Sequence, residues 1–448
     1  MVITKENDAQ EGNMEQRELF DQTENLFERL CTLETLTLGF KAVKANDGSP
    51  GIDRVTIKEF EARSDKELVQ LRAELCNWSY KPSPVRRVEI PKPNGGVRLL
   101  GVPCIRDRVV QASLKLLLEP IFDPCFSESS YGFRPRRSQR QAIESAQKFV
   151  QAGKEHVVDI DLSKFFDTIN HDRLLSQVKR KVPDSRIIKL IGLTLRSGVL
   201  ANGSLTPTTE GTTQGSPLSP LLSNIVLDEL DKELERRELA FCRFADDCNI
   251  FVGSKKSAER VMASVSLLLE KKMKLVVNRE KSKVAISSAV KFLGMTIVLG
   301  AITISANAMD KGMEKVKELT SRRSNQSIER AIEQFNSWYR GWSGYFEMTQ
   351  YPQQFALLEA HARRRFRARL VRNMKRRRTM AKMIVKDGQS TRTAKRVAYC
   401  HKSWWALSRD PAFERMFSNK WFEEQGMYIK SKETHTHWFA VKERIRFS

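Results

Sequence analysis

The sequence predicts an α+β fold with an antiparallel sheet, in a chain whose 448 residues exceed what one core usually holds. Two segments, 86–102 and 241–252, each consist of two short extended runs joined by a tight turn, which is the pattern of a β-hairpin. A third segment, 157–162, is a strand-like run that leads into a helical one. From about residue 305 the pattern becomes helical, so we expect two or three domains.

The N-terminal region is expected to start with a tail, followed by a helix. Residues 1–20 are polar and acidic and lack the apolar run of a signal peptide, so we predict that they are disordered. A helix is predicted around 26–44, before the Gly- and Pro-containing loop 47–53. The first hairpin comes next, because Asn94-Gly95 is a strong turn signal between extended runs. This hairpin carries three cations that, taken alone, could equally be solvated: Arg86, Lys92 and Arg98.

Acidic residues lie in two of the predicted strand regions. In the strand 157–162, Asp159 and Asp161 are two residues apart and would point to the same face. In the second hairpin, the adjacent Asp246 and Asp247 occupy the turn. Carboxylates projected from a rigid ladder suit Mg²⁺, a hard cation that takes oxygen ligands. Taken alone, an Asp-Asp pair in a turn is usually only a solvated turn, and a single Asp can also cap a following helix.

A Gly- and Pro-rich turn, 214–220, lies between the two acidic segments. The apolar run 221–230 that follows it predicts a helix. Glycine lets the backbone and the Gln214 side chain approach a flat ligand closely. In isolation, a plain connection between loop and helix would account for the same residues.

Taken in order, these segments resemble the motifs of reverse transcriptases. The matching residues are Asp161 with Phe165-Phe166, the turn 214–220, and Ala245-Asp246-Asp247. The subtype resembles the proteins encoded by bacterial group II introns, most similar to the compact group IIC class, over roughly residues 25–448. Supporting matches occur at 48–53, 86–98, 131–135, 278–281, 292–294 and 338–346.

The resemblance implies a right-hand polymerase fold, in which fingers and palm surround an antiparallel sheet. Residues 21–303 would form fingers and palm with an N-terminal extension, 304–385 a helical thumb or maturase region, and 386–448 a small DNA-binding domain. No Cys/His-rich module follows, so a homing endonuclease is not expected. We expect the thumb core, rather than a base-stacking platform, to hold the aromatic cluster Trp338, Trp342, Tyr345 and Phe346.

The resemblance also implies an activity. The protein would be an RNA-directed DNA polymerase that copies RNA into cDNA by two-metal nucleotidyl transfer, and it would assist intron splicing and mobility by binding intron RNA. Two Mg²⁺ ions, with Mn²⁺ as the alternative, would be held by Asp161 and Asp246, with Asp247 alongside. Its other partners would be an RNA template and a DNA primer or target. The residues implied around the incoming deoxynucleoside triphosphate are Arg86, Lys92, Arg98, Phe166, Gln214 and Lys281.

Three positions depart from the family pattern. Phe244 stands where Tyr usually precedes Ala-Asp-Asp, and Thr213 stands where Pro usually precedes Gln-Gly. Arg54 stands where relatives tend to have Gly. None of these changes removes an expected metal ligand, so polymerase activity is still expected.

The charge of the chain independently indicates a polyanionic partner. It has 77 Lys and Arg against 54 Asp and Glu, a formal net charge of +23 that folding alone does not require. The segment 363–378 contains many Arg residues and no acidic one, with Phe366, Leu370 and Met374 at every fourth position. This pattern predicts a helix with one apolar stripe. Its other faces would be cationic and would contact the phosphates along a nucleic-acid backbone. Its expected contacts with nucleic acid are Arg363, Arg364, Arg367 and Arg372.

Cysteine usage and hydropathy narrow the remaining possibilities. Seven scattered Cys without a Cys-x-x-Cys argue against a disulfide framework and a zinc finger. No apolar run approaches the ~20 residues of a membrane span, so we expect no membrane association and a bacterial cytoplasmic, nucleoid-associated location. A homodimer is left open.

Two alternative functions remain at this stage. One is a splicing maturase that acts mainly by binding RNA, against which the intact Asp161, Asp246 and Asp247 argue. The other is a domesticated group II-like reverse transcriptase in DNA repair or phage defence. A gene without flanking intron RNA would favour the second alternative.

Overall fold

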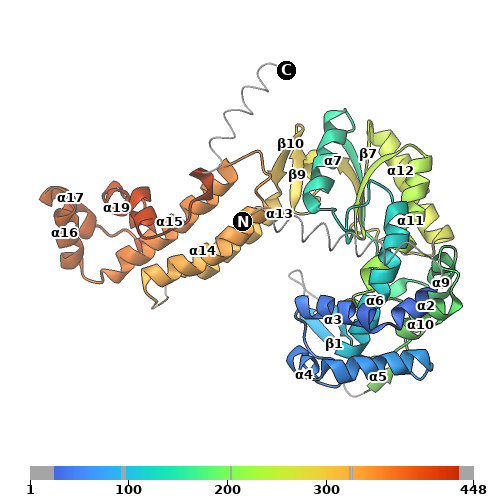
Figure 1. Cartoon of the computed structure of the whole chain (residues 1–448). Helices are drawn as coiled ribbons and strands as arrows, with labels where there is room; N and C mark the ends of the chain where they lie inside the picture. Colours follow the sequence, from blue (N-terminus) through green and yellow to red (C-terminus); the bar gives the residue numbers. More distant parts are fainter. Residues whose placement is uncertain (1–24, 92–96, 202–203, 322–323, 325, 433–448) are drawn as a thin grey trace, which may run out of the picture. The chain divides into compact units, whose positions relative to one another are not determined.

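The computed structural model describes residues 25–91, 97–201, 204–321, 324 and 326–432 (Figure 1). The predicted tail 1–20, Lys92 and the turn Asn94-Gly95 lie outside these residues. The chain separates into two units, residues 1–286 and 287–448, which we call unit 1 and unit 2. The predicted divisions at residues 303 and 385 stay a prediction. Across the described ranges, no helix is both long and apolar enough to cross a membrane.

Unit 1 starts with two helices where one was predicted. α2 (Leu26–Leu30) ends before Thr32, whose side chain accepts a hydrogen bond from the Thr35 N–H and so caps α3 (Leu33–Ala45). The prediction of one helix over 26–44 is therefore wrong at this break. α3 packs closely on α6, since a Cβ at Gly39 would lie 2.8 Å from the Val109 carbonyl oxygen. The next helices are α4 (Ile57–Glu61), α5 (Ser64–Cys76), α6 (Ile105–Phe122) and η1 (Asp123–Cys125).

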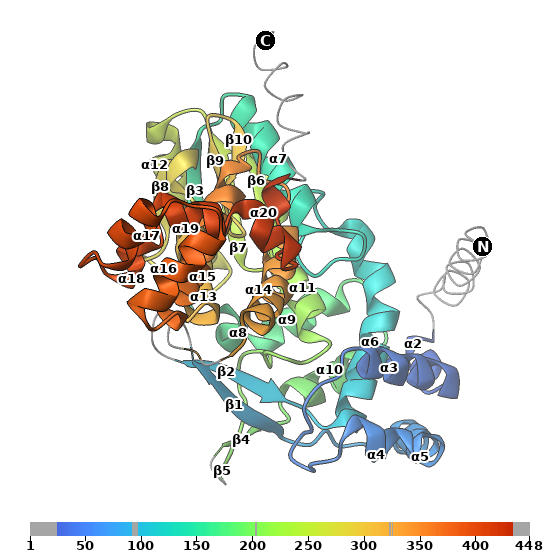
Figure 2. The same ribbon diagram turned by 90° about the vertical axis from the view of Figure 1, so that its left-hand side faces the viewer.

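The predicted first hairpin is confirmed. β1 (Val85–Pro91) pairs antiparallel with β2 (Val97–Val102), and the two strands lie side by side in Figure 2. β1 also pairs in parallel with β4 (Val199–Ala201), which continues to β5 (Ser204–Thr206). The result is a four-stranded sheet in the order β2-β1-β4-β5.

A second four-stranded sheet has the order β6-β7-β3-β8, and every pair in it is antiparallel. Its strands are β6 (Ala240–Phe244), β7 (Asp247–Val252), β3 (His156–Ile160) and β8 (Lys283–Ile286). α7 packs against β6 and β7, and α12 packs against β3, β7 and β8 (Figure 1). The predicted α+β fold with an antiparallel sheet is confirmed. The other helices of unit 1 are α7 (Gln139–Gln151), α8 (Phe165–Thr168), α9 (His171–Lys179), α10 (Ser185–Leu195), α11 (Ser219–Arg236), α12 (Lys255–Leu267) and η2 (Leu268–Lys272).

Unit 2 is helical after one short strand pair. η3 (Ser287–Ala289) comes first, β9 (Met295–Val298) then pairs antiparallel with β10 (Ala301–Ile304), and Ser305 caps the helix that follows the strands. The helical pattern predicted from about residue 305 is therefore confirmed. The helices are α13 (Ala306–Leu319), α14 (Ile328–Tyr345), α15 (Gln353–Asn373), α16 (Arg377–Lys386), α17 (Thr391–Ala398), α18 (Trp404–Leu407), α19 (Pro411–Met416) and α20 (Asn419–Glu424).

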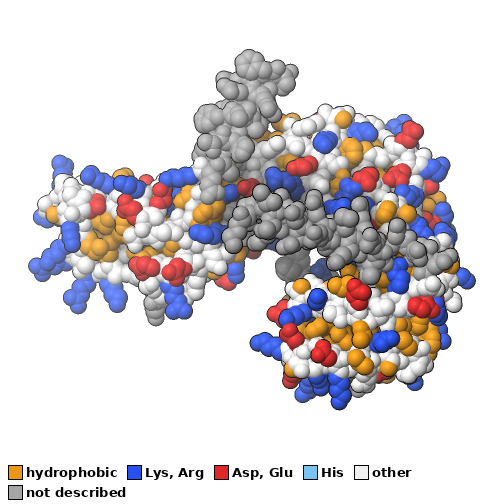
Figure 3. Space-filling view, viewed as in Figure 1, with side chains coloured by type: hydrophobic (Ala, Val, Ile, Leu, Met, Phe, Trp, Pro, Cys, Tyr) orange, Lys and Arg blue, Asp and Glu red, His pale blue; other side chains and the backbone are white. Residues whose placement is uncertain are grey.

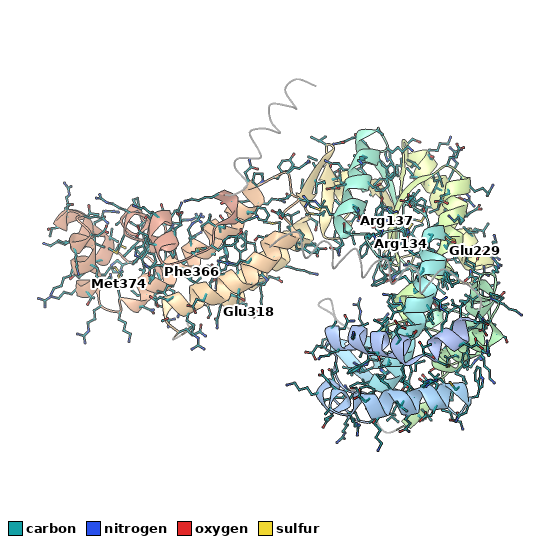
Figure 4. The ribbon with its side chains drawn as sticks, viewed as in Figure 1. Arg134, Arg137, Glu229, Glu318, Phe366 and Met374 are labelled. Carbon is teal, nitrogen blue, oxygen red and sulfur yellow. The ribbon has the colours of Figure 1, made fainter. Side chains whose placement is uncertain are left out.

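One apolar cluster runs through unit 2 from Val316 to Met427. Phe366, labelled in Figure 4, is fully buried in it and meets the Phe335 ring edge-on at 6.1 Å. The aromatic residues predicted to form a core do so, because Trp338 and Trp342 pack against this cluster and Phe346 is buried. Tyr345 is the exception, since it is 47% exposed and donates its hydroxyl to the Leu293 carbonyl.

Candidate active site

The adjacent carboxylates singled out in the sequence lie at a tight hairpin turn, but only Asp246 occupies the turn itself, so the prediction that both do is wrong for Asp247. β6 and β7 are joined by Ala245 and Asp246 alone, because Phe244 pairs directly with Asp247. Ala245 has φ +58°, the conformation that primed hairpin turns require at their first central residue. Asp246 therefore lies in the turn, and Asp247 is the first residue of β7. The two carboxylates leave a rigid ladder at adjacent positions.

Asp161 lies at the same edge of this sheet. In the antiparallel ladder, Ile160 of β3 is opposite Cys248 of β7, so the register continued by one residue sets Asp161 opposite Asp247. The backbone of Asp161 is fixed by Ser282, whose hydroxyl oxygen accepts its N–H at 3.0 Å. The Lys281 ammonium lies 3.7 Å from a carboxylate oxygen of Asp161. The structure thus brings Lys281 to the Asp161 carboxylate.

The environment of Asp246 favours a cation. Burial raises the pKa of the Asp246 carboxyl, and the negative charge of Asp161 raises it further, while Arg98 lowers it. A divalent ion beside Asp246 would offset both the burial of this carboxylate and its repulsion by the charge of Asp161. The oxygen donors of the two carboxylates fit a hard ion such as Mg²⁺, which keeps waters and substrate phosphates among its ligands. Among the described residues, no three acidic, His or Cys side chains form a ready-made metal site.

A cavity of about 740 Å³ lies beside Asp246. Three of the residues predicted around the nucleotide line it: Arg98, Phe166 and Gln214. They come from β2, α8 and the turn before α11, which lie far apart in sequence. The structure therefore gathers a cation, an aromatic ring and an amide next to a carboxylate, as a nucleotide site requires.

Backbone hydrogen bonds hold the walls of this cavity together. The Thr212 N–H donates to the Phe166 carbonyl at 2.6 Å, and the Gly101 N–H donates to the Gln214 carbonyl at 2.9 Å. Gly101 has no room for a side chain, because a Cβ there would lie 2.2 Å from the Thr213 methyl carbon. The segment 212–214 is thus fastened to α8 on one side and to β2 on the other.

Arg86 does not line the cavity. Its Nε and Nη2 both donate to the Pro50 carbonyl, at 3.1 and 2.8 Å, so the guanidinium fastens the loop 47–53 to the hairpin. The predicted contact of Arg86 with the triphosphate therefore stays a prediction that this arrangement does not support. Directly after this loop, Arg54 has φ +58°, a region that favours glycine, the residue expected there from the family resemblance.

Two residues that the sequence analysis did not single out, Arg108 and Phe133, also line the cavity. Arg108 is buried and donates to the carbonyls of Pro103 and Ser49. An arginine within the apolar segment 105–122 is the signal that could have indicated it. Phe133 is 46% exposed, and its positive φ is not a property that the sequence signals.

The basic segment 363–378 differs from its prediction in two ways. It is two helices rather than one, because α15 ends at Asn373 and α16 begins at Arg377. In addition, Arg363 and Arg367 are buried. The Arg367 Nε donates to the Phe417 carbonyl at 2.9 Å, so these two arginines serve the interior of unit 2.

Two other arginines of this segment lie closer to solvent. The Arg364 guanidinium lies over the Trp405 ring, 3.7 Å from its centroid, and is half-buried. Arg372 is exposed. Figure 3 shows further Lys and Arg side chains projecting from the part of unit 2 that holds α16 and α17. Unit 2 therefore has a cationic surface as predicted, but Arg363 and Arg367 of α15 are not part of it.

Comparison with known proteins identifies the family. Residues 90–297 match the family "Reverse transcriptase (RNA-dependent DNA polymerase)", and residues 309–386 match "Group II intron, maturase-specific domain". The chain belongs to the group II intron reverse transcriptase and maturase family. Membership implies use of a divalent metal and binding of RNA and DNA.

Three relatives illustrate the family. The chain is 35% identical to Protein YkfC of Escherichia coli (strain K12), over 56% of this chain and 76% of that protein. It is 34% identical to Group II intron-encoded protein LtrA of Lactococcus lactis subsp. cremoris, over 49% of this chain and 36% of that protein. It is 33% identical to the Putative COX1/OXI3 intron 2 protein of Saccharomyces cerevisiae (strain ATCC 204508 / S288c), over 57% of this chain and 30% of that protein. The match thus spans most of YkfC and about a third of each of the other two proteins.

Proposed function

We propose that this protein is an RNA-directed DNA polymerase that copies RNA into cDNA, and that it also binds intron RNA to assist splicing and mobility. One observation supports the polymerase most directly. Asp161 and Asp246 share one edge of an antiparallel sheet, beside a cavity that Arg98, Phe166 and Gln214 line. Phosphoryl transfer depends mainly on positioning and on neutralising charge, and this arrangement provides groups for both.

Asp161 and Asp246 would hold two Mg²⁺ ions, with Asp247 alongside; Mn²⁺ suits the same oxygen donors. When bound, these ions would activate the primer 3′-hydroxyl and neutralise charge on the leaving pyrophosphate. The nearby Lys281 would donate a proton to the pyrophosphate, since its ammonium lies 3.7 Å from Asp161.

The cavity residues would select and hold the deoxynucleoside triphosphate. The Arg98 guanidinium would pair with its phosphates, and Gln214 would support the nucleotide from the side of α11. Phe166 would place its ring under the sugar and exclude a 2′-hydroxyl. Arg86 is left out of this set because it bonds the Pro50 carbonyl.

Replacement of one carboxylate tests the polymerase. Asp246→Asn should abolish extension of a DNA primer on an RNA template, because a neutral amide cannot anchor a divalent cation beside phosphates. Asp172→Asn is the matched control, since that carboxylate lies on α9, is 88% exposed and pairs with Arg196. RNA binding should survive both changes. Extension by Asp246→Asn within about tenfold of wild type would contradict the assignment.

The match of residues 309–386 to the maturase-specific domain favours a second activity, splicing assistance through RNA binding. Its test is self-splicing of a group II intron RNA with and without the Asp246→Asn protein. If that variant promotes splicing as well as wild type does, the two activities are separable. If wild type promotes splicing and never extends a primer, the maturase function alone stands.

A further inference from the structure

Arg243 lies two positions before the turn Ala245-Asp246 and makes an extensive set of buried polar contacts. Its side chain and that of Asp231 are both 0% exposed. A guanidinium has five N–H donors, and each of those of Arg243 has an acceptor at 2.5–2.9 Å. The acceptors are both carboxylate oxygens of Asp231, the Asn224 amide oxygen, the Ser130 hydroxyl and the Ala245 carbonyl.

These acceptors belong to three different parts of the chain. Asn224 and Asp231 lie on α11, Ser130 lies in the segment 127–134, and Ala245 is the first residue of the turn itself. Backbone bonds join the same parts, because the Tyr131 N–H donates to the Arg243 carbonyl at 2.9 Å. Arg243 is therefore the point at which the turn is fastened to its surroundings.

The segment 127–134 is itself rigid where it meets the turn. Arg134, labelled in Figure 4, donates to the carbonyls of Ser127 and Ser130 and pairs with Asp123. Gly132 abuts the turn so closely that a Cβ there would lie 2.2 Å from the Ala245 nitrogen. Asn224 also donates to the Gly132 carbonyl, at 2.9 Å. The turn thus rests on a wall that hydrogen bonds hold in place.

Stability alone does not account for this arrangement. A buried ion pair is often no more stabilising than apolar residues of similar size, because both charges lose their hydration. Asp231 uses two of the five donors of Arg243, and one other donor goes to the backbone of the turn that holds Asp246. That bond fixes the direction in which the carboxylates leave the ladder.

We propose that Arg243 is a positioning residue for the metal-binding turn: its guanidinium holds Ala245, and thereby Asp246 and Asp247, in the geometry that binding of the divalent cation needs. The inference rests on the proposed polymerase function. Arg243 is fully buried and is not among the residues that line the cavity with Arg98 and Gln214, so it should govern metal binding and turnover rather than nucleotide affinity.

Arg243→Lys tests the inference, because lysine keeps the charge and cannot satisfy five acceptors in a fixed fork. Single-turnover extension should slow by about 10- to 100-fold, and the Kd for Mn²⁺, measured by electron paramagnetic resonance, should rise about tenfold or more. KM for the deoxynucleotide should change little. Arg367→Lys is the matched control: it alters a buried, ion-paired arginine of unit 2, and it should leave Mn²⁺ binding and the extension rate unchanged.

A second variant tests the same proposal if the Arg243→Lys protein does not fold. The double change Arg243→Met with Asp231→Leu removes both charges together, which the interior tolerates better than one unpaired charge. It should fold and still show the slow extension and weak Mn²⁺ binding. Extension and Mn²⁺ binding within about threefold of wild type, in either folded variant, would overturn the positioning role and leave the polymerase assignment standing. A wild-type protein that neither extends primers nor binds Mn²⁺ would overturn both.

Discussion

Phe166 is the residue on which sugar selection should depend. It lines the cavity from α8 and packs edge-on against Phe165, with ring centroids 5.3 Å apart. Its backbone carbonyl accepts a hydrogen bond from the Thr212 N–H, which holds the backbone at the ring in place. A rigid aromatic side chain in this position leaves little space for a 2′-hydroxyl.

Phe166→Val should therefore admit ribonucleotides. Incorporation of deoxynucleotides should fall less than the preference for them, because the change opens space beneath the sugar and leaves Arg98 and Gln214 in place. Single-turnover rates with matched deoxy- and ribonucleotides measure this. Phe165→Leu is the control, since that ring is buried in the core and not in the cavity wall. Equal discrimination ratios in wild type and Phe166→Val would assign the selection to another residue.

Asp107 gives stability a pH dependence. It is buried on α6, where it accepts hydrogen bonds from the Tyr80 hydroxyl and the Ser83 N–H. Burial raises the pKa of Asp107 from 3.8 to about 6, although both hydrogen bonds lower it. As pH rises through this window, the unfolded chain loses the proton first, so ionisation favours unfolding.

Wild type should therefore lose up to about 3 kcal/mol of unfolding free energy between pH 4 and pH 7 through this group. Asp107→Asn should lack that component, because the amide does not titrate. Urea unfolding of both proteins at several pH values measures the difference. If the two proteins have parallel pH profiles, Asp107 is ionised in the folded state across the whole range.

At the scale of elements, α15 separates structural from surface arginines. Arg363 and Arg367 point into unit 2, where Arg367 bonds the Phe417 carbonyl and pairs with Glu414 at 3.3 Å. Arg372, near the end of the helix, is exposed. The same substitution should therefore mainly affect stability at Arg367 and mainly affect RNA binding at Arg372.

Arg367→Gln should lower the melting temperature by roughly 2–8 °C, because a buried acceptor loses its donor. Arg372→Gln, at an exposed position, should lower the melting temperature less than Arg367→Gln does. It should reduce the slope of log affinity against log salt for RNA by about 0.7–0.9, the effect of one lost phosphate contact. Thermal melting and filter binding at several salt concentrations measure both. A salt slope that Arg372→Gln leaves unaltered would show that this side chain contacts no phosphate of the RNA.

At the scale of the whole molecule, the net charge of +23 should dominate binding to nucleic acid. If Lys and Arg side chains of the wild-type protein neutralise six or more RNA phosphates, its affinity for an RNA template should fall by about 10³-fold or more between 50 and 200 mM salt. Fluorescence anisotropy with labelled RNA measures this. Asp246→Asn should give the same slope, since it changes the metal site and none of the cations. An affinity that hardly depends on salt would mean that the excess charge is not the binding surface.

The sequence by itself determined the features that neighbouring residues encode. Local turn signals and hydrophobic spacing account for the hairpin that carries the adjacent carboxylates, for the hairpin of β1 and β2, and for the helix after the turn 214–220. The order of these motifs also sufficed for the family, because each motif supplies one part of a single catalytic site. Local signals of this kind depend little on the rest of the fold.

Only the tertiary structure decided which arginine side chains are buried and which groups they bond. The spacing of Arg363 and Arg367 gave no sign of burial, because Arg367 finds its acceptor in Phe417, fifty residues away in sequence. Arg86 likewise bonds Pro50, 36 residues away. Arg243 precedes the Ala245-Asp246-Asp247 motif by two residues, but the sequence did not indicate its role. Its five acceptors come from three separate segments. A charged side chain can be buried only where distant residues supply its partners, and sequence spacing does not encode that supply.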